Sequence, residues 1–183
     1  MTTTRRCTAT LVAVLVAVAS VGCSTQGPSQ GSLQVGGGSS VTLCIDPIVG
    51  EERALGATYA TNEGSSDITI TSVALVDATG VEAGAAFAIL DDGRDDGYSV
   101  GGQVPPNPQT DPYSVSAWER RVGAEGAVIA PGETWQVIQS VTVTSLDDAH
   151  FEALRIEYTE NGSTRVAQNT TRMGVEGYGP PCE

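Results

Sequence analysis

Hydrophobic and polar residues alternate along most of the chain beyond Val41, and this two-residue period limits the fold more than any other feature. A strand with one buried face shows it, because successive side chains point to opposite sides. In "DITITSVALV", Ile68 and Ile70 share one face, and the alternation then continues out of phase, which predicts a β-bulge near Thr71–Ser72. Two further alternating sets are Leu55, Ala57 and Tyr59, and Trp135, Val137, Val141 and Val143.

The stretch "FEALRIEYTENGSTRVAQ" predicts a β-hairpin. Leu154, Ile156 and Tyr158 lie on its inward face, and Asn161–Gly162 suits a tight turn. Shorter strands are expected at 41–45, 85–90 and 126–130, and no segment has the pattern of a long amphipathic helix. We therefore predict an all-β fold, a single immunoglobulin-like antiparallel β-sandwich of about seven or eight strands.

The first residues have the pattern of an export signal. Arg5 and Arg6 precede an uncharged apolar run from Ala9 to Val21, which is short for a bilayer span of about 20 residues. Small residues then lead to Cys23 and a polar stretch. This order resembles a bacterial lipoprotein signal: Val21, Gly22 and Cys23 fit its last three places, whereas Ser20 departs from the large aliphatic residue preferred there.

The resemblance implies a signal peptide at 1–22, a lipidated Cys23 with a Gly/Ser-rich tether at 23–40, and the sandwich domain at 41–183. It places the protein at the cell membrane, lipid-anchored on the extracytoplasmic side, with the membrane as a partner. Ordinary secretory cleavage and a retained membrane helix are the alternatives.

The composition also suits an exported bacterial protein. All nine basic residues are arginine, as in proteins of high-GC bacteria such as actinobacteria, which this composition resembles. The chain carries a net charge of −13; without 1–22, seven basic and 22 acidic residues leave −15. Because each phosphate contact needs a cation, nucleic acid is not expected as a partner.

The cysteines predict one disulfide. Cys7 leaves with the signal and Cys23 is the lipid site, so Cys44 and Cys182 remain as a pair in an oxidising compartment. Two cysteines and one histidine are too few for the usual zinc sites.

Residues 97–101, "GYSVG", match the Gly-x-Ser-x-Gly pattern of α/β-hydrolases. Ser99 is followed by Asp111, Asp147 and His150, so the order of a catalytic triad also fits. The context does not, because the seven polar residues "DDGRDDG" precede the motif and a proline-rich stretch follows it where a helix should begin. We interpret the motif as a loop and predict no catalytic residue.

The "DDGRDDG" stretch itself is a weak calcium candidate. Asp91, Asp92, Asp95 and Asp96 could supply carboxylate oxygens. The EF-hand pattern fails, since Arg94 stands where an oxygen ligand belongs, and a solvated turn is the favoured interpretation. No other metal and no cofactor are expected.

The longest stretch without strand alternation runs from Asp91 to Arg121 and is predicted to be a partner-binding loop. Residue types that concentrate binding energy gather in it: Tyr98, Tyr113, Trp118, Arg120 and Arg121. The predicted function is a non-catalytic cell-envelope lipoprotein, a binding or accessory module and not an enzyme, whose partner is an envelope protein or a glycan. The alternatives are a calcium-dependent adhesion module and a small serine hydrolase that uses Ser99.

The lipid anchor can be tested directly. Cys23→Ala should release the protein from the membrane fraction or leave it uncut, because the thiol of Cys23 is the group expected to carry the diacylglycerol. Mass spectrometry of the native N-terminus checks this; an unmodified terminus at another residue contradicts the prediction.

Overall fold

The computed structural model describes residues 31–36, 41–45, 49–94, 97–98, 102–147, 149–175 and 182. The expected signal peptide, Cys23 and the tether segments 24–30 and 37–40 lie outside these residues. Within the described part, no helix is both long and apolar enough to cross a bilayer.

Twelve strands and one helix form in these described ranges. The strands are β1 (Leu33–Val35), β2 (Val41–Ile45), β3 (Glu52–Asn62), β4 (Ile68–Val76), β5 (Val81–Leu90), β6 (Val122–Gly123), β7 (Val128–Ile129), β8 (Thr134–Val143), β9 (His150–Phe151), β10 (Ala153–Glu160), β11 (Ser163–Gln168) and β12 (Thr171–Val175). The helix is α1 (Pro112–Arg120). Eight of these strands have five or more residues, and the other four are edge pieces of two or three.

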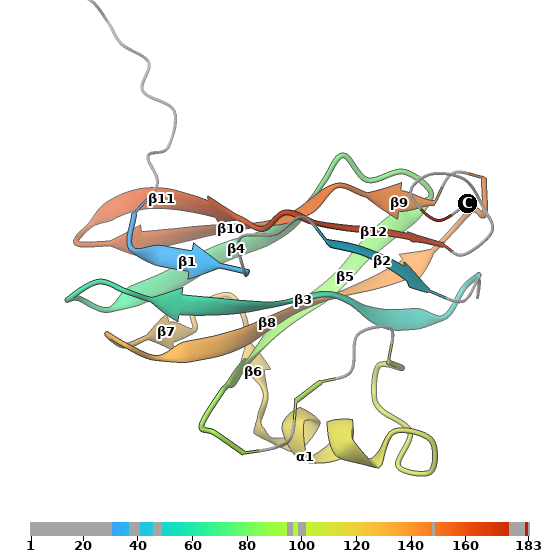
Figure 1. Ribbon diagram of the computed structural model, residues 1–183, viewed down its shortest axis with the longest axis horizontal. Helices are drawn as coiled ribbons and strands as arrows, with labels where there is room; N and C mark the ends of the chain where they lie inside the picture. Colours follow the sequence, from blue (N-terminus) through green and yellow to red (C-terminus); the bar gives the residue numbers. More distant parts are fainter. Residues whose placement is uncertain are drawn as a thin grey trace, which may run out of the picture.

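Two sheets face each other (Figure 1). A five-stranded sheet has the order β1-β3-β8-β5-β6, and a four-stranded sheet has the order β11-β10-β4-β7. Ile68 and Ile70 from β4 and Ile156 from β10 pack with Ala88 of β5 and Val137 of β8 in the core between them. The predicted all-β antiparallel sandwich is confirmed.

A third, three-stranded sheet of order β2-β12-β9 completes the sandwich. Phe151 and Met173 of this sheet pack on Val141 of β8. β2 and β12 pair in parallel, unlike the antiparallel ladders elsewhere in the described part. The predicted disulfide is confirmed: it joins Cys44 of β2 to Cys182, with 5.7 Å between the Cα atoms.

The predicted bulge and hairpin are also found. Ile70 pairs with Tyr158 while Ser72 pairs with Glu157, so Thr71 is the extra residue of a bulge. Asn161 and Gly162 both have positive φ in a two-residue turn between β10 and β11, which matches the twist of the strands.

The segment expected to be a tether contributes a strand. Leu33 is 4% exposed, and β1 pairs with the edge of β3. The Tyr158 hydroxyl accepts from the Gly31 and Leu33 amides at 3.1 and 3.3 Å, and the Glu160 carboxylate accepts from Ser32 Oγ at 2.6 Å. That bond to Ser32 lowers the pKa of Glu160. The sandwich therefore begins before Val41, because Leu33 packs in the core and the donors of Gly31, Ser32 and Leu33 are bonded to side chains of β10.

Helix α1 was not expected from the sequence. The Asp111 side chain accepts from the Ser114 amide at 3.3 Å, and Pro112 follows at a first-turn position where its missing N–H costs nothing. Figure 1 shows α1 on the side of the five-stranded sheet away from β10 and β11.

Reduction of Cys44–Cys182 should lower the free energy of unfolding. The bridge spans 138 residues of sequence, and the chain-entropy model gives such a closure up to about 5 kcal/mol. Urea unfolding of the domain with and without reductant measures the difference. Unchanged midpoints would contradict the prediction.

Candidate functional site

The described residues of the segment from Asp91 to Arg121, which we call the cover, lie on the outer face of the five-stranded sheet. Tyr98 and Ala117 are buried on this face with Phe87, Ile89 and Ile138. The rings of Tyr98 and Trp118 lie 5.4 and 5.2 Å from that of Phe87, both edge-on. The segment was predicted to be a partner-binding loop without strand alternation, and the structure shows that two of its aromatic residues, Tyr98 and Trp118, also pack against the sheet.

Tyr98 is fastened to the central strand β8. Its N–H donates to Gln136 Oε1 at 2.8 Å, and its carbonyl accepts from Gln136 Nε2 at 2.9 Å. Its hydroxyl donates to the Gln103 carbonyl. Burial, with the charges of Asp111 and Glu52, raises the pKa of Tyr98 to about 12 against an opposing effect of Arg121. Tyr98 thus stays neutral at physiological pH and serves packing.

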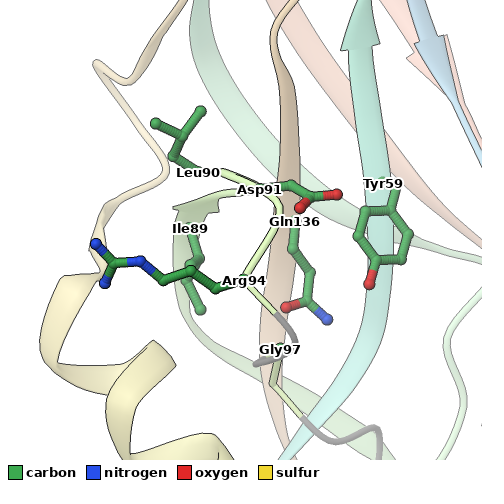
Figure 2. A pocket seen from close by; sticks show the side chains of 7 residues that line it. All are labelled: Tyr59, Ile89, Leu90, Asp91, Arg94, Gly97 and Gln136. Carbon is green, nitrogen blue, oxygen red and sulfur yellow. The ribbon is translucent and has the colours of Figure 1, made fainter.

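A pocket of about 260 Å³ opens beside this cover (Figure 2). Three strands form the floor of the pocket. Gln136 of β8 pairs with Tyr59 of β3 on one side and with Ile89 of β5 on the other, so the strand register places the three residues side by side. Leu90, Asp91, Arg94 and Gly97 complete the lining. Figure 2 shows the Asp91 carboxylate directed towards Tyr59 and the Arg94 guanidinium directed away from it.

Tyr59 departs from the expected phase of its strand. Its side chain is 52% exposed, whereas the neighbouring Thr58 and Ala60 are buried in the opposite direction. It lies on the outer face of the sheet, where Asp91, Arg94 and Gly97 border it but leave about half of it exposed. Tyr59 and Gln136 were not predicted as site residues: the alternation placed Tyr59 in one set with Leu55 and Ala57, and the register shift between Leu55 and Thr58 that changes its phase has no signal in the sequence.

The two described aspartates of the 91–97 stretch, Asp91 and Asp92, contact backbone and arginine groups. Asp92 is within 3.0 Å of Arg94 and 3.5 Å of Arg120, so arginines neutralise it. Asp91 Oδ1 accepts from the Gly93 amide at 3.2 Å. Asp95 and Asp96 lie outside the described residues. Among the described residues no group of three or more His, Cys, Asp and Glu side chains could hold a metal ion.

The structure brings together three of the residues predicted to bind a partner, since the rings of Tyr98 and Trp118 lie 6.0 Å apart and Arg121 lies over Trp118. Tyr98 is buried, while Tyr113 is 74% exposed on α1. Trp118 belongs to the aromatic cluster, and Arg121 lies over its ring with 3.5 Å between Cζ and the ring centroid. Arg120 pairs with Asp92 and donates to the Leu90 carbonyl at 3.4 Å.

The parts of the possible triad do not converge where they are described. Asp111 caps α1, and His150 pairs in β9 with Thr79. Figure 1 places α1 and β9 on opposite sides of the five-stranded sheet. Ser99 lies outside the described residues.

Comparison with known proteins gives a weak likeness. No family model and no curated protein matches the chain. The structure of the VesB protease of Vibrio cholerae is similar at 11% identity and a TM-score of 0.41, over 78% of this chain and 32% of that chain. The secreted serine protease VesC of Vibrio cholerae is similar at 14% identity and a TM-score of 0.32, over 73% of this chain and 21% of that chain. The chain thus spans about a third or less of each protease.

These neighbours correct one prediction. The sequence was interpreted as a non-catalytic binding or accessory module and not an enzyme, and both neighbours are proteases by name, so that exclusion is wrong. It rested on the lack of a convincing linear motif. Catalytic groups are assembled in space from distant segments, so a missing motif excludes little. At these TM-scores the likeness gives the chain no activity of its own.

Loss of the cover should destabilise the domain. Tyr98→Ala removes a buried ring, and such substitutions cost about 3–5 kcal/mol. Tyr113→Ala, at the exposed tyrosine of α1, is the matched control and should change stability by less than about 0.5 kcal/mol. Deleting 92–116, which removes Tyr98 and the Asp111 cap, should have the larger effect. Thermal and urea unfolding measure both, and a Tyr98→Ala variant as stable as Tyr113→Ala would contradict this role.

Proposed function

We propose that the pocket beside Tyr59 binds a neutral sugar residue of an envelope glycan. The observation that carries this proposal is the half-exposed Tyr59 ring facing the carboxylate of Asp91 across the pocket. An aromatic face packs against the C–H face of a sugar, and a carboxylate accepts from its hydroxyl groups. Ligand sites typically combine such an apolar surface with a few placed polar groups.

The charge of the site favours a neutral ligand over an acidic one. Asp91 is the carboxylate directed into the pocket, and the guanidinium of Arg94 points away and is held by Asp92. The whole chain carries −13, which adds repulsion towards acidic polymers. The amide of Gln136 is already bonded to Tyr98 in both directions, so it shapes the floor and Asp91 supplies the acceptor.

The proposed place of action is the outer face of the cell membrane. The lipoprotein-like order of Arg5–Arg6, the apolar run and Cys23 supports a lipid anchor there. An envelope glycan would then be within reach of the pocket. Whether bound glycan is also cleaved is measured in the same experiment as binding.

Tyr59→Ala should weaken binding of a neutral trisaccharide about tenfold, because the stacking surface is lost. The matched control is Tyr113→Ala, which removes an exposed tyrosine outside the pocket. Asp91→Asn should also weaken binding while the amide oxygen still accepts from Gly93, and the exposed Asp67→Asn is its control.

The probes are maltotriose, cellotriose, xylotriose and mannotriose, measured by calorimetry, with mass spectrometry of the sugars after incubation. If the unaltered protein converts a trisaccharide to shorter sugars and Tyr59→Ala does not, the pocket beside Tyr59 both binds the glycan and cleaves it. No binding to any of the four, or equal loss in Tyr59→Ala and Tyr113→Ala, would overturn the proposal.

A further inference from the structure

A second concave surface lies at the other margin of the cover, between α1 and β5. This groove has a volume of about 390 Å³ and is lined by Ala85, Phe87, Val104, Trp118, Arg121 and Val122, with two further small residues. Val122 is 45% exposed, so an apolar surface faces solvent here. The groove shares no lining residue with the pocket beside Tyr59.

Arg121 gives the groove a cation, and no carboxylate of the described residues lies within 4.0 Å of it. Five other arginines of the described part lie within 4.0 Å of a carboxylate: Arg53, Arg94, Arg120, Arg155 and Arg172. Arg121 instead lies over the Trp118 ring, with 3.5 Å between Cζ and the ring centroid, and its Nη1 donates to the Trp118 carbonyl at 2.7 Å. A guanidinium has five N–H donors in one plane, so donors remain along the edge of a group that the indole holds in place.

The edge of β5 beside the groove offers backbone groups. β6 pairs with β5 only at Phe87 and Ala88, and among the described residues no strand pairs with Val81–Ala85 on that side. The part of the β5 edge that no described strand pairs with is short. β5 bulges between Ala83 and Ala86, where the Gly84 and Ala85 carbonyls accept from side chains of β8, and Glu82 follows beyond the bulge. A bulge and a charge are features that stop a long strand from adding to an edge.

We propose that this groove binds the C-terminal end of a polypeptide whose last residue is apolar. The terminal carboxylate lies at Arg121, the last side chain packs against Trp118, Val104 and Val122, and the preceding residue meets the β5 edge. A chain end fits where a longer strand is stopped by the bulge. The positive charge of Arg121, which is exposed at the rim of the groove, complements the carboxylate and can donate two parallel hydrogen bonds to it.

The two tryptophans of the chain allow a direct test, since the indole N–H of each gives one signal in a ¹H–¹⁵N spectrum. Trp135→Phe assigns them. Acetyl-Ala-Val-Leu with a free carboxylate should shift the Trp118 signal saturably and leave the Trp135 signal in place. The same peptide with a C-terminal amide should bind at least tenfold more weakly, because the ion pair is lost.

Arg121→Gln should weaken the free-acid peptide about tenfold, whereas Arg155→Gln, at an arginine paired with Glu157 on the other sheet, should not. Tyr59→Ala should leave peptide binding unchanged, which separates this site from the glycan pocket. Equal binding of acid and amide, or no effect of Arg121→Gln, would overturn the proposal. So would 3-phenylpropionate binding as tightly as the peptide, which would make the groove a site for small carboxylic acids.

Discussion

Strand β8 is buried on both faces, and the arrangement of the domain depends on this. Six consecutive residues, Gln136–Val141, are buried. In an ordinary sandwich only the inner face of each sheet is covered. In this domain Val137 packs on that inner face. The outward residues Gln136 and Ile138 therefore need a second cover, which the 91–121 segment supplies through Tyr98 and Ala117. The amide of Gln136 matters most, because a buried amide is costly without partners and Tyr98 satisfies both its donor and its acceptor.

The sequence predicted the parts of the fold that local rules control. The bulge at Thr71 and the turn at Asn161–Gly162 follow from alternation and from residues that accept positive φ. Strand β1 and helix α1 could not be found in this way, since each depends on distant partners: Leu33 on Tyr158 of β10, and Ala117 on the outer face of the sheet. Short segments have little pattern of their own, so tertiary contacts decide their structure.

The candidate site was harder to predict than the fold for a related reason. Tyr59, Ile89 and Gln136 are neighbours only because three strands pair in one register. Composition drew attention to the aspartates, of which Asp91 does line the pocket, and to aromatic residues of the long segment, of which Tyr98 and Trp118 pack on the sheet. Tyr98 is buried, and Asp92 is paired with arginines.

Both concave surfaces follow from the size of the cover. The segment crosses the sheet from β5 to the edge of β3, where Val104 N–H donates to the Glu52 carbonyl, and it returns through α1 to β6. It is narrower than the sheet it covers, so strand residues at both of its margins remain partly open to solvent. At one margin the open residue is Tyr59, and at the other the β5 edge lies beside Trp118 and Arg121. A wider cover would bury more apolar area of the sheet and would leave neither concave surface. Because the cover is narrow, residues of two rigid strands remain accessible from solvent.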